Sequence, residues 1–367
     1  MANNKGPVSR PVPTDFLQLE RLVLNLKGSE WQRLCTKKRE RLVEMCFRYW
    51  RMRGFPYYRL SDSEMSQEYR RLVAISKENI LLGSEVQMSM TGVKLANSFH
   101  PQMWCVPVTH ARSPVDCFND DEKFRRLIRR ALTIWPDRYS VNETNLRGML
   151  RTFSHTARVS NFRPTAAKAI YEHYSKDGDL VVDFSAGYGG RLLGCLPLNR
   201  RYKGVDPCNE QVRGLNKMLA KLKRLVPVQA QTSIHQSCAE DFLPTLEPRS
   251  ASLVFSSPPY FNHERYSIEP SQSYIRYPEY DKWVEGFLKK VILESRRILK
   301  AGGYLVLNVA DVNGFSVATD ALRIASNHFT LTEVLRLRLG HKPYLRHLTG
   351  EIYKYEPVFV FKRTSRR

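Results

Sequence analysis

The stretch Ser257-Pro258-Pro259-Tyr260 combines residue types that could bind a planar amine, and it directly follows the apolar run 251–255. Two consecutive prolines fix two φ angles and remove two backbone donors, so the carbonyl groups here meet no competing donor. The Ser257 hydroxyl and the Pro258 carbonyl can together accept both protons of an exocyclic amine. The Tyr260 ring offers a flat face on which a base can stack. A proline-rich strand exit without chemistry is the alternative interpretation.

A glycine-rich turn precedes this stretch in the sequence Asp183-Phe184-Ser185-Ala186-Gly187-Tyr188-Gly189-Gly190. An apolar strand that leads through glycines into a helix is how a doubly wound sheet brings its backbone close to a ligand. The spacing differs from the G-x-G-x-x-G of dinucleotide sites, and the G-K-S/T of a P-loop is absent. The next apolar run ends in Asp206, which could accept hydrogen bonds from ribose hydroxyls. The alternative is a turn glycine with a helix-capping aspartate.

A third acidic position, Asp241, follows the next predicted strand. An acid at a strand end could bind the amino group of an adenine. The alternative is that Asp241 is the N-cap of a short helix that begins at Phe242.

Positioning these residues requires a sheet whose strand ends meet at one edge. From about residue 160, short apolar runs alternate with helical patterns, which predicts an α/β fold with a doubly wound, mainly parallel sheet and crossover helices. The runs 331–338 and 356–362 have no long helix between them and predict an antiparallel last strand. The predicted strands are 180–184, 202–207, 226–235, 252–255 and 304–309, and the predicted helices are 165–174, 191–196, 209–224 and 279–300.

The chain before this point has a different pattern. Helical periodicity covers 14–52 and 119–150, and a further helix is predicted to begin near Ser61, whose polar neighbours suit an N-cap. Residues 85–118 are interrupted by prolines and show little periodicity. We therefore expect a mainly helical N-terminal region, 1–155, followed by one α/β domain, 156–367. A role of the N-terminal region in DNA recognition is one interpretation.

The charge favours a polyanionic partner. The chain has 58 Lys and Arg against 36 Asp and Glu, a formal net charge of +22. This excess is spread along the chain, so a basic surface would have to be assembled by folding. Nucleic acid is the first candidate partner and an anionic membrane the second. The alternative is a basic soluble protein without such a partner.

The cysteines and the hydropathy pattern exclude other classes. The 7 cysteines are scattered without a C-x-x-C pair or a His/Cys cluster, so neither a zinc site nor a disulfide framework is predicted. No apolar stretch approaches the ~18 residues of a membrane span, and the N-terminus lacks an apolar signal core. These observations predict a cytoplasmic protein without a metal or a membrane partner.

Residues 160–363 resemble the class I S-adenosylmethionine-dependent amino-methyltransferases, specifically the DNA methyltransferases that act on exocyclic amines. Ser257-Pro258-Pro259-Tyr260 corresponds residue for residue to the family's catalytic motif, and D-F-S-A-G-Y-G-G resembles its F-x-G-x-G cofactor motif. The segment 161–170, N-F-R-P-T-A-A-K-A-I, resembles the motif that packs against the cofactor. The resemblance implies a Rossmann-like fold and S-adenosylmethionine as cofactor. The implied cofactor-binding residues are Asp183, Phe184, Gly187, Gly189, Asp206, Asp241, Phe162 and Pro164, and the implied catalytic residues are Ser257, Pro258, Pro259 and Tyr260.

The resemblance also implies the reaction. A methyl group would pass from S-adenosylmethionine to an exocyclic amine of a base flipped out of double-stranded DNA. Serine at the first motif position is typical of enzymes that methylate cytosine at N4, and aspartate of those that methylate adenine at N6, so Ser257 favours cytosine N4. A bacterial or phage modification enzyme with cognate restriction or defence components fits this picture.

Several alternatives stay open at this point. They are adenine-N6 methylation, methylation of RNA or of a protein glutamine, and a catalytically inactive nucleic-acid-binding protein. Methylation at cytosine C5 is excluded, because it would need a nucleophilic cysteine, commonly after proline, and none of the 7 cysteines has that context.

Overall fold

The computed structural model describes residues 20, 21, 23, 31–107, 112–134, 141–152, 159–312, 314–341 and 353–364. The chain divides into two compact units. One comprises Met1–Tyr57 and His110–Arg158, and the other comprises Tyr58–Thr109 and Val159–Arg367. The predicted boundary at residue 155 therefore differs from the observed division, because residues 58–109 group with the sheet-containing unit.

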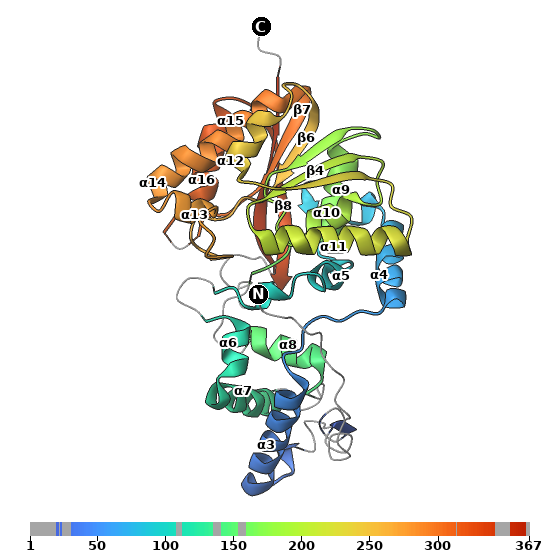
Figure 1. Ribbon diagram of the computed structural model, residues 1–367, viewed down its shortest axis with the longest axis vertical. Coiled ribbons are helices and arrows are strands. Elements are labelled where there is room, and N and C mark those ends of the chain that lie inside the picture. Colours follow the sequence, from blue (N-terminus) through green and yellow to red (C-terminus); the bar gives the residue numbers. More distant parts are fainter. Residues whose placement is uncertain are drawn as a thin grey trace, which may run out of the picture. The chain divides into compact units, whose positions relative to one another are not determined.

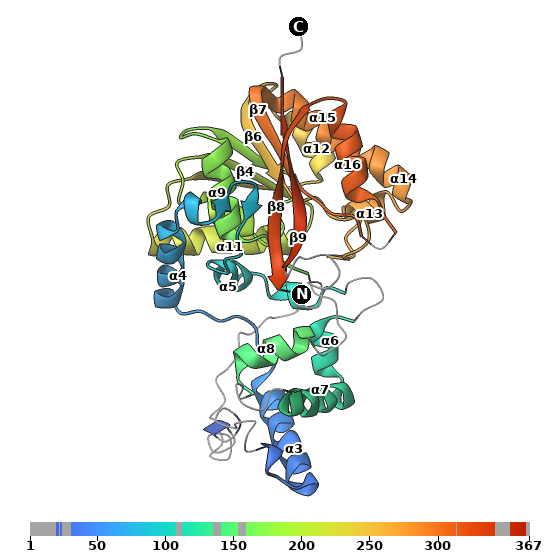
Figure 2. The same ribbon diagram turned by 180° about the vertical axis from the view of Figure 1, so that it is seen from behind.

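A nine-stranded sheet forms the centre of the second unit, in the order β1-β2-β8-β9-β7-β6-β3-β4-β5. Strands β5, β4, β3, β6 and β7 are mutually parallel, and β9 runs antiparallel to both β7 and β8. Figure 2 shows β8 and β9 side by side. The predicted doubly wound, mainly parallel sheet with an antiparallel last strand is confirmed. The main strands are β3 (Leu180–Asp183), β4 (Arg201–Asp206), β5 (Gln231–Gln236), β6 (Ala251–Ser256), β7 (Leu299–Asn308), β8 (Thr330–His341) and β9 (Tyr353–Lys362).

Helices cover both faces of this sheet (Figure 1). Neighbouring strand residues alternate between two hydrophobic cores, as the two-residue period of a strand requires. Val181 packs into the core with α9 (Pro164–Tyr174), α10 (Gly190–Cys195) and α11 (Asn209–Leu225). Val182 packs into the other core. The helices on that side include α12 (Ala239–Phe242), α14 (Tyr280–Trp283), α15 (Lys289–Ile298) and α16 (Val317–Ser326).

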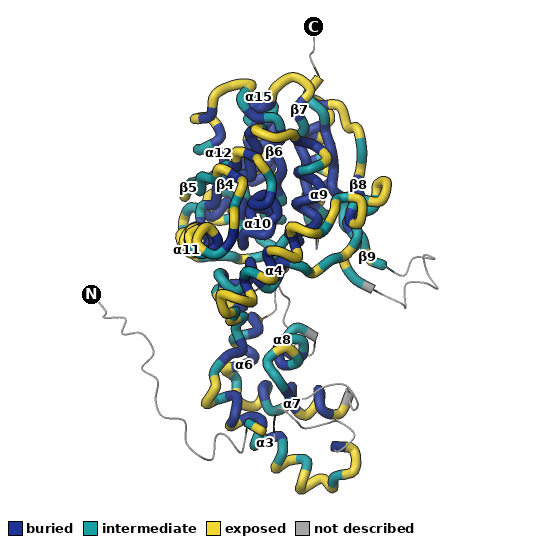
Figure 3. The backbone as a smooth tube through the Cα atoms, turned by 90° about the vertical axis from the view of Figure 1, so that its right-hand side faces the viewer, coloured by how far each residue is buried: buried dark blue, intermediate teal, exposed yellow. Residues whose placement is uncertain are grey.

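Burial follows the same layers. In Figure 3 the central strands are buried along most of their length, and α11 has one buried and one exposed face. The predicted strand 226–235 begins only at Gln231, and Pro227, which has no backbone donor, lies in the part that forms no strand. The predicted helix 279–300 is divided into α14, a π-helical turn (Val284–Leu288) and α15.

Residues 58–107 extend the second unit. Ser61 is the N-cap of α4 (Asp62–Ala74) and forms a capping box with Glu64, which confirms the predicted helix start. The short strands β1 (Leu81–Leu82) and β2 (Glu85–Val86) pair with each other, and β2 continues the sheet beside β8. Periodicity could not reveal two-residue strands, which explains why this addition to the sheet was missed.

The first unit is helical in the part that the structure describes. It contains α3 (Thr36–Arg53), α6 (Pro114–Asn119), α7 (Asp121–Ile134) and α8 (Glu143–Thr152). Trp50 is fully buried and donates to the Val141 carbonyl at 3.0 Å. Within the predicted helix 14–52, residues 20, 21, 23, 31 and 32 are helical and α3 begins at residue 36, whereas 14–19, 22 and 24–30 lie outside the described residues. No helix within the described ranges is long and apolar enough to cross a membrane.

Candidate active site

The glycine loop and the Ser-Pro-Pro-Tyr stretch leave the sheet side by side. Strands β3 and β6 are parallel neighbours, with Val182 opposite Val254, so both segments emerge at the carboxyl edge. The strand order reverses here, because the chain continues from β3 to β4 on one side and later returns to β6 on the other. Such a switch point is where doubly wound sheets bind their ligands. The two predicted motifs therefore meet at this place on the carboxyl edge, which we call the crevice.

The glycine loop has a conformation that side chains would disturb. Gly187 and Gly189 have φ angles of +54° and +76°, in the left-handed region. A Cβ atom on Gly190 would lie 1.8 Å from the Phe162 carbonyl oxygen. Asn161 holds the loop from both sides, since its Nδ2 donates to the Tyr188 carbonyl at 2.8 Å and its Oδ1 accepts from the Gly190 amide at 3.0 Å. Sequence reasoning had missed Asn161.

Asp183 lies beneath the loop and is fully buried. Its carboxylate accepts from the Arg191 Nε at 2.8 Å, the Tyr202 hydroxyl at 2.9 Å and the Ser256 hydroxyl at 2.9 Å. Because these partners come from α10, β4 and β6, Asp183 ties the ends of three elements together. Phe184 is likewise buried, in the core that contains α15. Asp183 and Phe184 therefore support the glycine loop from the core side.

Phe162 and Pro164 pack against the same loop region from the start of α9. The Phe162 ring contacts the Phe255 ring edge to face, with 5.3 Å between the ring centroids. Pro164 is buried at the first position of α9, and its carbonyl oxygen lies 2.5 Å from where a Cβ on Gly194 would stand. The predicted motif thus packs closely on the glycine loop and its helix.

Asp206 lies at the end of β4 and faces the glycine loop. Its carboxylate accepts from the Gly187 amide at 2.9 Å and from the Cys208 amide at 3.0 Å. Burial raises its pKa to about 6, against the lowering effect of these two bonds. A carboxylate has about four acceptor positions, and the two amides occupy two of them. Asp206 therefore retains acceptor capacity for a hydroxyl-bearing ligand.

The structure does not bring Asp241 to this edge as a buried acid. Its side chain is 56% exposed and forms an ion pair of 2.7 Å with Arg276. Cys238, rather than Asp241, is the N-cap of α12. The buried acid of this turn is Glu240, which pairs with the same Arg276 at 2.8 Å. Burial raises the pKa of Glu240.

A segment that follows the Ser-Pro-Pro-Tyr stretch, residues 267–272, lies across the carboxyl ends of β4 and β5. Glu269 accepts from the Asn209 amide at 3.3 Å, at the start of α11. Ser271 donates to the Pro207 carbonyl at 3.3 Å, and its own carbonyl oxygen lies 3.3 Å from the Cys238 sulfur. This segment, which we call the covering segment, therefore lies beside the two strand ends next to Asp206.

Several buried polar atoms around this edge have no hydrogen-bond partner among the residues that the structure describes. They are the Tyr188 hydroxyl in the glycine loop, the Gln211 Oε1 in the first turn of α11 and the Gln272 Nε2 in the covering segment. Buried polar groups are nearly always hydrogen-bonded in native proteins, so such a group calls for a ligand or a water molecule. These atoms and the spare acceptor positions of Asp206 suit a ligand rich in hydroxyl, amine and carboxylate groups.

On the other side of the crevice, Tyr260 contacts an acid that the sequence had not indicated. Its hydroxyl donates to Glu356 Oε1 at 2.5 Å. Glu356 belongs to β9, and Val358 two residues later pairs with Asn308, the last residue of β7. The register therefore places Glu356 at the same edge of the sheet as the Ser-Pro-Pro-Tyr stretch.

Glu264 is a second acid in this region. It accepts a hydrogen bond from the Tyr266 hydroxyl, and the Tyr266 ring contacts that of Tyr188 in the glycine loop, with 6.1 Å between centroids. Burial, joined by the charge of Glu356, raises the pKa of Glu264 to about 7, although the Tyr266 hydrogen bond opposes this shift. Glu264 thus lies near both borders of the crevice.

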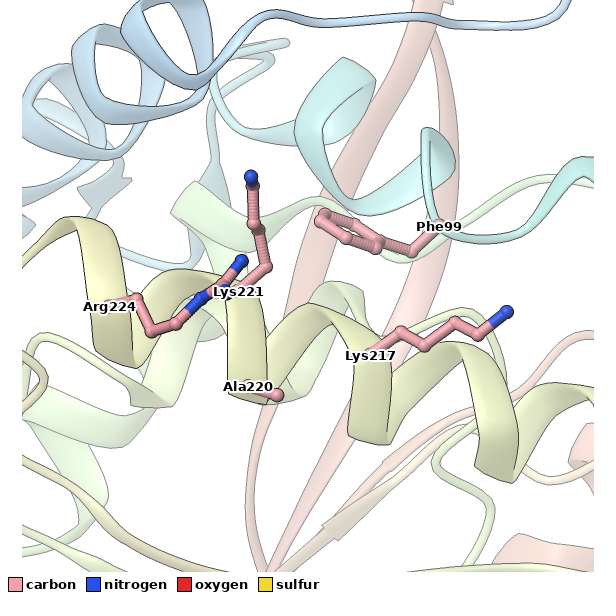
Figure 4. A pocket seen from close by; sticks show the side chains of 5 residues that line it. All are labelled: Phe99, Lys217, Ala220, Lys221 and Arg224. Atoms are coloured by element: carbon pink, nitrogen blue, oxygen red, sulfur yellow. The ribbon is translucent and has the colours of Figure 1, made fainter.

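A separate groove carries positive charge along α11. It encloses about 450 Å³ and is lined by Phe99, Lys217, Ala220, Lys221 and Arg224. Figure 4 shows the Phe99 ring facing the side chains of α11. Lys221 pairs with Asp62 at 2.5 Å, whereas Lys217 and Arg224 form no ion pair within the described part of the chain. Two cations beside an aromatic ring form a surface that suits a nucleic acid.

Comparison with known proteins adds a family to this geometry. A family model described as DNA methylase, of the N6 and N4 type, matches residues 251–367, which contain the Ser-Pro-Pro-Tyr stretch and β9. Residues 251–367 match the DNA methylases. The type II methyltransferase M.BglI of Bacillus subtilis is 35% identical over 85 residues, which are 23% of this chain and 22% of that protein.

Solved structures with a similar arrangement are methyltransferases of several kinds. TrmN from Thermus thermophilus has a TM-score of 0.38 and 13% identity, covering 55% of this chain and 48% of that one. An S-adenosylmethionine-dependent O-methyltransferase from Thermotoga maritima has a TM-score of 0.37 and 13% identity, covering 57% and 69%. The matched segments thus span about a fifth of the length of M.BglI and about half of that of TrmN.

The DNA methylase match agrees with the residues at the crevice. S-adenosylmethionine carries ribose hydroxyls, an amino group and a carboxylate, which are the groups that Asp206 and the unpaired buried atoms could bind. The match together with this donor and acceptor set indicates S-adenosylmethionine as the cofactor.

Proposed function

We propose that this protein transfers a methyl group from S-adenosylmethionine to an exocyclic amine of a DNA base. The observation that carries the proposal is the placement of the glycine loop and the Ser-Pro-Pro-Tyr stretch on adjacent parallel strands at the switch point. The DNA methylase match over residues 251–367 supports it independently.

The proposed cofactor residues divide into two roles. Gly187, Gly189 and Asp206 line the cofactor side of the crevice, whereas Asp183 and Phe162 hold the loop in place from behind. The methyl group itself is supplied by the bound cofactor as a sulfonium methyl. Phe184 and Pro164 act in the same supporting way, and Asp241 acts only through Arg276, which also holds Glu240.

The proposed catalytic residues orient the amine. An aromatic amine is a poor nucleophile because its lone pair is delocalised into the ring. Hydrogen bonds from its two protons to the Ser257 hydroxyl and the Pro258 carbonyl favour a pyramidal nitrogen that can attack in line. Pro259 fixes the backbone, and the ring of Tyr260 stacks on the base, which repays part of the few kcal/mol needed to flip it. Orientation supplies most of the rate.

Ser257 leads us to propose cytosine N4 as the target, with adenine N6 as the alternative. The experiment is to incubate double-stranded DNA with the protein and labelled S-adenosylmethionine, digest the DNA and separate the nucleosides. We expect the label in N4-methyldeoxycytidine. Label only in N6-methyldeoxyadenosine would refute the cytosine assignment and leave the amino-methyltransferase assignment intact.

We further propose that the groove along α11 contacts DNA phosphates. Exchanging Lys217 and Arg224 for glutamine should weaken DNA binding equally for all sequences and reduce the slope of log K against log salt by about 2. The maximal rate at saturating DNA should not change. The slope is obtained from equilibrium binding constants measured at salt concentrations between about 50 and 200 mM.

The control for this prediction removes the same charge elsewhere. Lys282 in α14 and Lys289 in α15 lie on the face of the sheet opposite α11, and they pair with Glu279 and Glu285. Their exchange for glutamine should leave the slope within about 0.5 of the native value. Equal slopes in the two double variants would contradict a phosphate role for the groove.

Recognition of a DNA sequence by the helical unit is a further proposal. In the described part of this unit, Arg125 and Arg129 pair with Glu44 and Glu40 at 2.8 and 2.6 Å. Contacts to DNA would therefore be made by basic residues outside these pairs.

A cytoplasmic location and a cognate restriction or defence component are part of the same proposal.

A further inference from the structure

Tyr260 lies next to Ser257 and next to an acid on β9. Its hydroxyl donates to Glu356 Oε1 at 2.5 Å, and Glu356 is half-buried. Burial and the charge of Glu356 raise the pKa of Tyr260, and the nearby Ser257 side chain opposes this rise. If the amine binds to Ser257, Tyr260 links it to a carboxylate on β9.

The register of the sheet explains why these residues meet. Ser256 pairs with Leu307 on β7, and Leu307 pairs with Phe359 on β9. Because β9 runs antiparallel, the residues just before Phe359 lie at the carboxyl edge, level with the residue that follows Ser256 and separated from it by β7. An antiparallel last strand is what brings the start of β9 to this position.

The titratable neighbours of Glu356 in the described part of the chain are Glu264, Tyr260 and the buried Arg163, and Glu356 forms no ion pair there. Arg163 donates to the Arg338 carbonyl. The Tyr260 hydroxyl is therefore the hydrogen-bond donor that the structure gives to Glu356.

Methyl transfer produces a proton that must leave the nitrogen. As the N–C bond forms, the C–S bond of the donor breaks, and sulfur keeps the electron pair as a neutral thioether. The amine nitrogen then carries a positive charge and one proton in excess of the product.

We propose, on the basis of the proposed function, that this proton leaves through Ser257 and Tyr260 to Glu356. The nitrogen gives a proton to Ser257 Oγ, Ser257 gives its own to Tyr260 Oη, and Tyr260 gives its own to Glu356 Oε1. The methylated amine and both hydroxyls end neutral, and Glu356 ends as a carboxylic acid that later exchanges with water. Glu356 acts through Tyr260 and is therefore a positioning residue.

The test compares Tyr260→Phe, Glu356→Gln and the double variant in single-turnover methylation of DNA. Each single variant should lower the rate constant about 100-fold, the order expected for a lost proton transfer. The double variant should be no slower than either single variant, because residues acting as one unit are not additive. The affinities for DNA and S-adenosylmethionine should stay within about threefold of native.

A second tyrosine–glutamate pair provides the matched control. Tyr174 donates to Glu333 Oε2 at 2.6 Å, near the start of β8 and so at the opposite edge of the sheet. Tyr174→Phe and Glu333→Gln should leave the rate within about threefold of native. A native-like rate for Glu356→Gln, or multiplicative losses in the Tyr260 and Glu356 double variant, would overturn the proposal.

A measurement without turnover separates this inference from the proposed function. In protein labelled with ¹³Cζ-tyrosine, the Tyr260 signal is identified by its loss in Tyr260→Phe. Glu356→Gln and Glu356→Asp should shift this signal, and Glu333→Gln should not. An unshifted signal would refute the link even if methylation occurs, and absence of native methylation with a shifted signal would refute only the function. If Glu356→Gln fails to fold, Glu356→Asp carries both readouts.

Discussion

Exchanging Ser257 for alanine should lower the single-turnover rate constant for methyl transfer by about 10²- to 10³-fold, the loss typical when a group that stabilises the transition state is removed. In the proposed mechanism the hydroxyl is one of two acceptors for the amine protons, and Ser257 is half-buried. Binding of S-adenosylmethionine should be unchanged, because the proposed cofactor residues lie at the ends of β3 and β4. Rapid quench with labelled cofactor gives the rate constant, and calorimetry gives the affinity.

Ser250 provides the control for this substitution. Its hydroxyl donates to the Glu247 carbonyl in a turn at the opposite end of β6, and its exchange for alanine should change the rate less than about twofold. A Ser257→Ala protein with a near-native rate would contradict the assignment of the amine to Ser257. Loss of cofactor affinity in that variant would instead assign Ser257 to the cofactor side of the crevice.

Exchanging Gly190 for alanine should remove cofactor binding and destabilise the protein by roughly 3 kcal/mol, at the upper end of what overpacking costs. The new Cβ would lie 1.8 Å from the Phe162 carbonyl oxygen and 2.5 Å from Asn161 Oδ1. The first of these atoms is backbone, so the loop has to move. Asn161 would then lose its bonds to both ends of the loop. Urea unfolding and calorimetry with S-adenosylmethionine measure the two effects.

Gly340 on β8 is the matched control, because a Cβ there would have no neighbour within 4 Å and its φ is negative. Gly340→Ala should stay within about 0.5 kcal/mol of native stability and bind the cofactor normally. Native-like stability and affinity in Gly190→Ala would contradict the close packing of Phe162 on the glycine loop.

The central strands were largely predictable because buried strands form short apolar runs between helices. The runs at 180–184 and 252–255 correspond closely to β3 and β6, and the carboxyl ends of parallel strands meet at one edge of the sheet. The two motifs could therefore be placed at one edge from the sequence.

Roles that depend on burial could not be predicted in the same way. The sequence shows Asp183 and Asp241 simply as acids after strands, and only the structure reveals that one is fully enclosed by donors and the other is exposed. The division at residue 57 likewise depends on two-residue strands that have no periodicity of their own.

Contacts between distant segments were also beyond the sequence pattern. Glu356 meets Tyr260 only because β9 is antiparallel and in the register that pairs Val358 with Asn308. Asn161 lies in the segment 161–170, but only the structure shows that this side chain binds the glycine loop. A polar residue directly before a buried helix start is the signal that could have indicated Asn161.

The most direct test of the central claim offers the native protein tritiated S-adenosylmethionine together with double-stranded DNA, RNA and a protein extract as competing acceptors. If the glycine loop and the Ser-Pro-Pro-Tyr stretch form one site for methyl transfer to a base amine, label should enter the DNA, at an exocyclic nitrogen, and only with intact Ser257. Label in RNA or protein and none in DNA would contradict the account.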